Sequence, residues 1–215
     1  SFREHDFNSA VALKARELAE KRGFEVLFTQ QPYMNDIPVQ TRAAWANEEY
    51  RKKPVLCLIS FHANASSNRN ATGWSLFHWH DSVNGKKLAD LWAKHVQPLK
   101  PWGQGIWKSE RGTWTNFIVV RDPVMPCLLI EHFFFTNPDD LKKYNTPEMI
   151  DFFAQATVKT ICEYAGVEYN MSENIMGKSE LTVEQMRKFL RDINPKSPDV
   201  ERIYLEEGEV EGVRG

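Results

Sequence analysis

The spacing of apolar and polar residues predicts alternating helices and strands up to about residue 166. In the first segment, Asn8, Val11, Ala15 and Leu18 recur on one stripe, as in an amphipathic helix. Two later stretches, LCLIS and PCLLI, are almost wholly apolar, which is typical of strands buried on both faces of a sheet. The pattern predicts helices over residues 4–22, 39–50, 82 or 84 to 96 and 138–164, and strands over residues 24–29, 54–61, 73–80, 116–120 and 126–130.

Strands that alternate with helices favour an α/β fold. We expect a three-layer sandwich with a mostly parallel, twisted sheet and helices on both faces. Residues 98–115, rich in Trp and Gly, are predicted as a long surface loop. After Gly166 the chain turns polar, so we predict a catalytic domain over residues 1–166, a linker over 167–179, and the start of a truncated second domain over 180–215, where Thr182 and Gln185 form a capping box.

Composition narrows the class of protein. A chain of 215 residues can bury one ample core. A net charge of −2 provides no basic field, so nucleic acid is not an expected partner. The three cysteines lack metal-binding or disulfide spacing, and no apolar run is long enough to span a membrane. The chain opens without Met, so we expect that upstream sequence is missing.

Three polar residues stand where buried elements meet the predicted carboxyl edge of the sheet. His62 and Glu131 follow the two apolar strands, and Glu4 lies on the inward stripe of the first helix, four residues before Asn8. One imidazole and two carboxylates suit a zinc hydrolase, in which a carboxylate takes a proton from water. Simpler roles remain open: a core or turn histidine at 62, a helix-dipole partner at Glu4, and an ion pair between Glu131 and Arg121.

Several motifs carry a more specific resemblance. EHDFN (4–8), SFHANA (60–65), TGW (72–74) and the stretch 116–140 with its PCLLIEHFFFTN segment resemble, in order and spacing, the zinc-dependent N-acetylmuramoyl-L-alanine amidases of bacterial autolysins and phage endolysins. The resemblance covers roughly residues 1–165. It implies Zn²⁺ as cofactor, Glu4 and His62 as ligands and Glu131 as general base. The tail looks, more loosely, like the opening of a glucosaminidase-type domain.

The chain departs from this family at one point. Family members carry another zinc-ligating histidine after a first strand, upstream of the position that Glu4 takes, so the resemblance implies an N-terminally truncated chain. His5 points off the face of Glu4. His78 and His80 share one face of a predicted strand and are the reserve candidates, whereas His132 would point to the side opposite Glu131.

The resemblance implies cleavage of the amide between N-acetylmuramic acid and L-alanine in peptidoglycan. We expect Asn64 to shape the turn beside His62 and Arg121 to orient Glu131. Asn64 and Arg121 are also the expected substrate-binding residues. Trp102, Trp107 and Trp114 would border the groove for glycan or stem peptide. The expected site of action is the bacterial cell wall, after secretion or phage-type release, with a possible second lytic domain in the full chain. The alternatives are a zinc carboxypeptidase-like hydrolase and a non-catalytic cell-wall-binding module.

Overall fold

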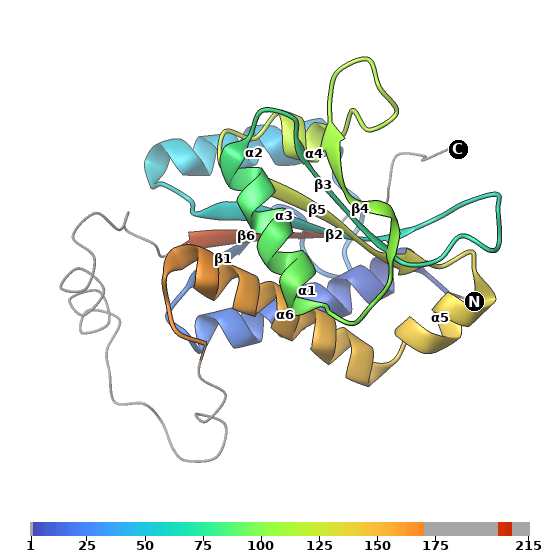
Figure 1. The fold of residues 1–215 in the computed structure, drawn as a ribbon. Helices are drawn as coiled ribbons and strands as arrows, with labels where there is room; N and C mark the ends of the chain where they lie inside the picture. Colours follow the sequence, from blue (N-terminus) through green and yellow to red (C-terminus); the bar gives the residue numbers. More distant parts are fainter. Residues whose placement is uncertain (1, 170–201, 208–215) are drawn as a thin grey trace, which may run out of the picture.

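One mixed β-sheet organises the chain, in a computed structural model that describes residues 2–169 and 202–207 (Figure 1). The helices are α1 (Glu4–Glu20), α2 (Val39–Lys52), α3 (Val83–His95), α4 (Ile118–Arg121), α5 (Pro138–Tyr144) and α6 (Pro147–Ala165). The strands are β1 (Glu25–Phe28), β2 (Cys57–Asn64), β3 (Trp74–Trp79), β4 (Pro101–Ser109), β5 (Cys127–Phe134) and β6 (Arg202–Glu207).

The sheet runs in the order β1-β6-β2-β5-β3-β4. Neighbouring strands are parallel except β3 and β5, which pair antiparallel. Every residue of β2 and β5 is buried, as their apolar sequences predict. The mostly parallel sheet is therefore confirmed.

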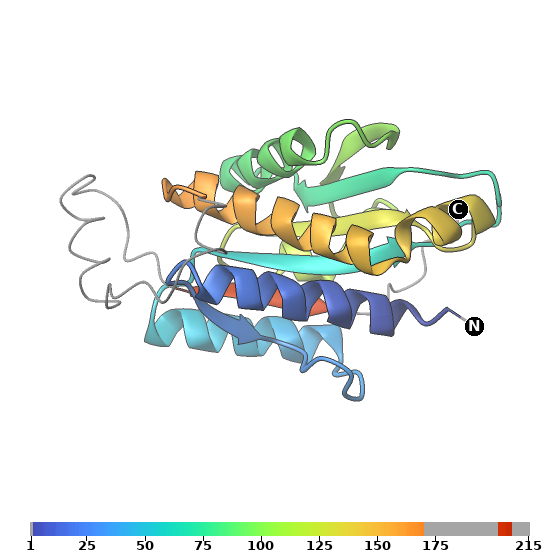
Figure 2. The ribbon, with the colours of Figure 1, turned by 90° about the horizontal axis from the view of Figure 1, so that it is seen from below.

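Helices cover both faces of this sheet and enclose two apolar cores. Helices α1, α3 and α6 pack on one face, where their side chains join Ile59 and Phe61 of β2, and Figure 2 shows α1 and α6 side by side. Helices α2 and α4 pack on the other face, against Leu58 of β2 and Leu129 of β5. The predicted three-layer sandwich is confirmed. Within the described residues, no helix has the length and apolar character needed to cross a lipid bilayer.

Strand β6 lies between β1 and β2 and pairs parallel with both. Ile203 stands opposite Val26 on one side and Cys57 on the other. These six residues fall in the range predicted as a separate second domain, so for them the prediction is wrong. The start of the predicted linker also packs on the first domain, since Arg22 lies 3.9 Å above the Tyr169 ring. Residues 170–201 and 208–215, with the predicted capping box, lie outside the described residues.

Three predicted elements differ from the structure. The predicted loop over 98–115 contains strand β4, which pairs with β3 alone at the sheet edge and accommodates Gly103 and Gly105 at positive φ. The predicted strand over 116–120 is wrong because its apolar residues form the short helix α4, which buries Val119 and Val120. The last helix is two helices, and Thr146 caps the second by accepting a hydrogen bond from Met149 N.

Candidate functional site

His62 and Glu131 are direct neighbours across strands β2 and β5. The two residues are paired in the parallel register, so they stand on the same face of the sheet. Side chains alternate along β2, and Leu58 of the α2–α4 core has the same parity as His62, which places both site residues on the α2–α4 face. Both residues lie within their strands, two or three residues before the ends, rather than after them as the sequence suggested.

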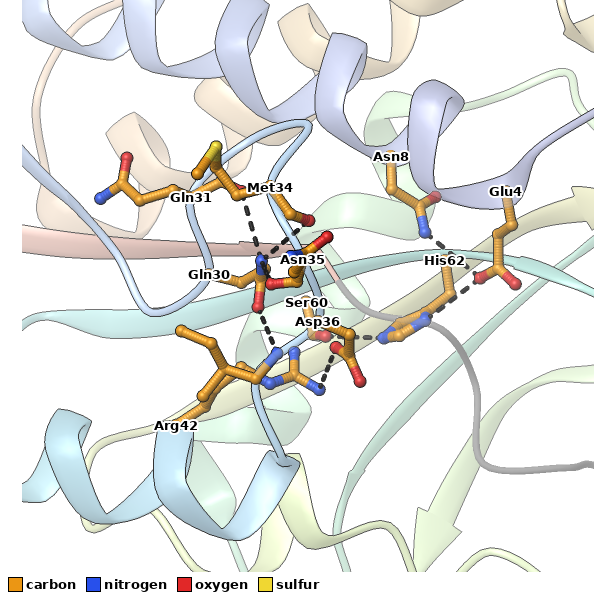
Figure 3. Close-up of polar contacts among 11 residues, drawn as sticks. Glu4, Asn8, Gln30, Gln31, Met34, Asn35, Asp36, Arg42, Ser60 and His62 are labelled. Atoms are coloured by element: carbon orange, nitrogen blue, oxygen red, sulfur yellow. Dashed lines mark hydrogen bonds and ion pairs between the residues drawn. The ribbon is translucent and has the colours of Figure 1, made fainter.

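Glu4 reaches this edge from the first turn of α1. Its Oε1 lies 3.4 Å from His62 Nδ1 and accepts a hydrogen bond from Asn8 Nδ2 at 3.2 Å (Figure 3). The same oxygen accepts another hydrogen bond from Ala63 N at 3.2 Å. Asn8 is fully buried one turn further along the helix. The inward placement of Glu4 is therefore confirmed, and a backbone amide of β2 ties it to the strand that carries His62.

Ser60 holds the other nitrogen of the His62 ring. Its Oγ lies 2.7 Å from His62 Nε2, two residues back on the same face of β2. In the tautomer in which Nε2–H donates a hydrogen bond to the Ser60 hydroxyl oxygen, the lone pair of Nδ1 faces Glu4. Nδ1 is buried and has no hydrogen-bond partner. In that tautomer, one imidazole lone pair lies beside one carboxylate.

Glu131 is a buried carboxyl group without a hydrogen-bond partner. Its side chain has no solvent exposure, and neither carboxylate oxygen has a donor in the part of the chain that the structure describes. Burial, and then the neighbouring charge of Glu4, raise the pKa of the Glu131 carboxyl well above its usual range. A group in that state is a strong proton acceptor once a nearby positive charge favours its ionised form.

These donors match zinc in chemical type. Zinc takes imidazole nitrogen and carboxylate oxygen ligands, and a cation would satisfy both the His62 nitrogen and the buried negative charge. The described part of the chain, however, contains no group of three or more His, Cys, Asp or Glu placed to hold a metal. The described residues therefore offer two zinc donors, Glu4 and His62, with Glu131 beside them.

A cavity of about 370 Å³ opens on this face next to His62. Its lining includes residues from the start of α2, such as Arg42, and from the segment before α4, such as Trp114. Trp114 is half exposed and packs against Trp107, with ring centroids 5.5 Å apart. Of the three predicted groove tryptophans, only Trp114 lines the cavity; Trp102 and Trp107 lie on β4 behind it.

The structure agrees with some of the contacts predicted for the remaining residues and contradicts one of them. Asn64 shapes its turn as expected, because its Oδ1 accepts a hydrogen bond from Ala65 N at 2.8 Å. The orienting role of Arg121 is wrong: its guanidinium donates to Asp122 and Asn116, and Glu131 has no donor. His132 points to the opposite face of the sheet from Glu131, as predicted. There it stacks on Phe61, which belongs to the core covered by α1, α3 and α6.

His78, a further candidate zinc ligand from the sequence, also lies away from Glu4 and His62. Its Nδ1 contacts Trp79 O at 2.8 Å, and it lines a separate pocket together with Trp107.

The sequence analysis did not identify Arg42 as a residue of the cavity, although its spacing in the helix indicates an inward position. Arg42 and Ala46 are four residues apart in α2 and both are buried, so the arginine lies on the apolar stripe.

Solved structures of two cell-wall amidases share this fold. The chain superposes on the catalytic domain of CwlV, an N-acetylmuramoyl-L-alanine amidase from Bacillus (Paenibacillus) polymyxa var. colistinus, with a TM-score of 0.64 and 23% identity over 77% of this chain and 86% of that one. It also matches the CwlD amidase from Clostridioides difficile, with a TM-score of 0.62 and 23% identity over 78% of this chain and 89% of that one. It therefore has the fold of cell-wall amidase catalytic domains.

Sequence comparison defines the family. Residues 1–163 match the family described as N-acetylmuramoyl-L-alanine amidase, and the chain belongs to it. A curated relative, the probable cell wall amidase LytH of Staphylococcus aureus, is 25% identical over 137 residues, which are 64% of this chain. The match spans 41% of the length of that relative.

Proposed function

We propose that this protein is a zinc-dependent hydrolase that cleaves the amide bond between N-acetylmuramic acid and L-alanine in peptidoglycan. The observation that supports it best is the facing pair of His62 Nδ1 and Glu4 Oε1, 3.4 Å apart, beside the unpartnered Glu131 carboxyl. Membership of the amidase family supports peptidoglycan as the substrate class. The expected place of action is the bacterial cell wall.

In this mechanism the chain holds the metal and moves the proton. Glu4 and His62 would bind zinc, with Ser60 fixing the ring through Nε2. When bound there, the ion would supply Lewis acidity to polarise the scissile carbonyl and to make water more acidic. Glu131 accepts the proton from the attacking water and passes it to the leaving amine nitrogen. A cation held by Glu4 and His62 would keep the Glu131 carboxylate ionised and ready to accept a proton.

Two other functions use the same fold. A carboxypeptidase-like hydrolase would also use Glu and His ligands with a glutamate base. A non-catalytic cell-wall-binding module would retain the fold without turnover. Digestion of purified peptidoglycan separates the three: new L-alanine amino termini indicate the amidase, released C-terminal amino acids indicate the peptidase, and sedimentation with the wall without products indicates the binding module.

The digestion should include two glutamate variants. With zinc added to the assay, Glu131→Gln should abolish the slow appearance of L-alanine amino termini while zinc still binds, because Glu131 is assigned to proton transfer. Glu110→Gln, at an exposed glutamate, is the matched control and should digest normally. Equal digestion by both variants would refute the role of Glu131.

Zinc affinity is a separate prediction. Two protein donors hold zinc less tightly than the three usual in a catalytic site. We therefore expect the 215-residue chain to lose zinc on dialysis and to hydrolyse peptidoglycan slowly. Stoichiometric zinc after dialysis, measured by atomic emission together with full activity, would contradict this and show that another residue completes the site.

A further inference from the structure

His132 is a polar side chain buried in an apolar core. It follows Glu131 in β5 and is 1% exposed. Four aromatic rings have centroids 4.6–5.9 Å from the centroid of its imidazole, namely those of Phe7, Phe61, Trp92 and Phe153. An apolar side chain could fill this space without burying polar nitrogen atoms, which cost free energy unless they are hydrogen-bonded. A histidine at this position is therefore explained by what its nitrogen atoms bind.

One ring nitrogen of His132 holds the backbone of His62. Nδ1 of His132 lies 2.8 Å from His62 O. A carbonyl oxygen only accepts hydrogen bonds, so Nδ1 carries the proton and donates the hydrogen bond. Nε2 is buried and has no hydrogen-bond partner among the described residues. The bond to the His62 carbonyl is thus the polar contact that this position provides for the imidazole.

This hydrogen bond joins the two strands at the point where their register changes. The last regular pair joins His62 to Glu131. The next joins Asn64 to Phe134, so β5 has one residue more than β2 in between. Such a bulge disrupts the ladder of backbone hydrogen bonds locally. A side-chain contact at this point therefore has more effect on the position of His62 than it would have in the regular part of the ladder.

The peptide group between His62 and Ala63 is held from both sides. Its carbonyl oxygen accepts the hydrogen bond from His132, and its N–H donates to Glu4 Oε1 at 3.2 Å. A trans peptide group is planar and directs its C=O and N–H to opposite sides. A rotation of this group about its long axis would therefore break both contacts together, so the two side chains act on one rigid unit.

This rigid unit connects the two zinc donors. Glu4 Oε1 lies 3.4 Å from His62 Nδ1 (Figure 3). The described part of β6 pairs with β2 as far as Phe61, one residue before His62, so it does not restrain this peptide group. A peptide group that turned would change the direction of the His62 side chain and withdraw the Ala63 N–H from Glu4 at once.

We propose that His132 is a positioning residue of the zinc site, which fixes the peptide group after His62 and through it the directions of the two donors. The inference rests on the proposed zinc-hydrolase function. His132 touches neither metal nor substrate in this scheme, because its ring lies on the opposite face of the sheet, against Phe61. Its hydrogen bond keeps His62 and Glu4 at the spacing that a cation needs.

The test separates the hydrogen bond from the packing of the ring. His132→Phe keeps an aromatic ring in the core and removes the donor. His132→Asn removes the ring and keeps a donor, since the amide nitrogen of asparagine takes the position of Nδ1. Phe153→Leu is the packing control, because Phe153 contacts the same imidazole at 4.6 Å between centroids and has no polar side-chain atom.

Zinc affinity is the first readout, measured on the full chain by competition with a chelator. His132→Phe should bind zinc ~10-fold more weakly, the lower end of the effect of groups that orient metal ligands. His132→Asn should retain most of the affinity, and Phe153→Leu all of it, although both should unfold at lower temperature. Unchanged affinity in His132→Phe would overturn the proposal. Weakening in all three variants in proportion to their loss of stability would also overturn it, because it would show a role in packing alone.

Hydrogen exchange of the Ala63 amide is a second readout, and it needs no metal. The amide of Leu58, near the start of the same strand, donates to Pro126 O at 2.9 Å and provides the internal reference. The ratio of the two exchange rates cancels a change in global stability. This ratio should rise in His132→Phe, because the peptide group is then held from one side. An unchanged ratio would overturn the proposal even if His132→Asn failed to fold.

The outcome is separable from that of the proposed function. Zinc affinity that depends on the donor at position 132, without release of L-alanine amino termini from peptidoglycan, would refute the amidase assignment and keep the positioning role. Release of amino termini with equal kcat and equal zinc affinity in His132→Phe and the unaltered chain would keep the amidase and remove the positioning role.

Discussion

Replacing Glu131 by Gln should stabilise the metal-free protein while it abolishes catalysis. The Glu131 carboxyl has no solvent exposure and no hydrogen-bond donor, and burial and Glu4 raise its pKa. The folded protein therefore keeps a proton at pH values where the unfolded chain has lost it. The contribution of this carboxyl group to the free energy of unfolding is fully present below its unfolded pKa of ~4.3. It is lost as the pH rises through the pKa of the group in the folded protein.

The gain comes from ionisation, because the Gln amide would be as unsatisfied as the protonated carboxyl but cannot lose a proton. Each unit of difference between the folded and unfolded pKa corresponds to ~1.4 kcal/mol. We expect Glu131→Gln to gain ~1–3 kcal/mol at pH 8 in the presence of a chelator. For a chain of this size, each kcal/mol raises Tm by ~2–4 °C.

The assay is urea or thermal unfolding of both proteins between pH 4.5 and pH 8 with chelator present. The advantage of Glu131→Gln should grow with pH, and Glu110→Gln should show no such trend. Added zinc should reduce the difference, because a cation lowers the free energy of the ionised carboxylate. A variant that is less stable at pH 8, or an advantage independent of pH, would refute the reasoning.

Four further outcomes are expected. Burial lowers the pKa of His132 to about 3, so the protein should lose stability as the pH falls from ~6.5 toward 3, and His132→Phe should weaken that loss in urea unfolding. Asp140→Ala should cost ~2–4 kcal/mol in thermal unfolding because Gly73 N and Phe134 N lose their acceptor, whereas exposed Asp139→Ala should cost little. Ser60→Ala should weaken zinc binding ~10–100-fold in a chelator competition, since Ser60 is the partner of His62 Nε2 among the described residues; an unchanged affinity would exclude this positioning role. A chain that ends after residue 169 should unfold at lower urea than the full chain, because it lacks the strand between β1 and β2; equal midpoints would show that β6 adds no stability.

The sequence predicted the buried centre of the fold well, since hydrophobic burial leaves a strong pattern there. The apolar runs of β2 and β5 indicated a parallel sheet covered on both faces, and they placed His62 and Glu131 at the same edge. The inward stripe of α1 brought Glu4 to the same place. Strand register brings His62 next to Glu131, and helix periodicity turns Glu4 toward them. Both follow directly from the spacing of residues in the sequence.

The missed elements lack such a pattern. Strand β4 contains Pro and Gly and pairs on one side only, so it needs neither apolar continuity nor a full ladder. Helix α4 has four residues, too few to show a helical period. The charged sequence of β6 reads as a surface segment, and only its two neighbouring strands reveal its place.

The site residues that failed or escaped prediction depend on tertiary contacts. Arg121 was assigned to Glu131 by its position near the strand, but its neighbours Asp122 and Asn116 take its donors. Arg42 looks like an ordinary helix-surface arginine until the segment before α4 folds over it and forms the cavity.

The position of β6 has a consequence for how the protein is made. Strands β1 and β2 leave the ribosome early, yet the strand that joins them is Arg202–Glu207, more than half the chain later. Until that segment emerges, both strands present unpaired edges that invite pairing with other chains. Native pairing must also wait for a long loop to close, which makes folding slow. Expression conditions that slow aggregation, such as low temperature or a holdase chaperone, should therefore raise the soluble yield more than the stability of the finished fold would suggest.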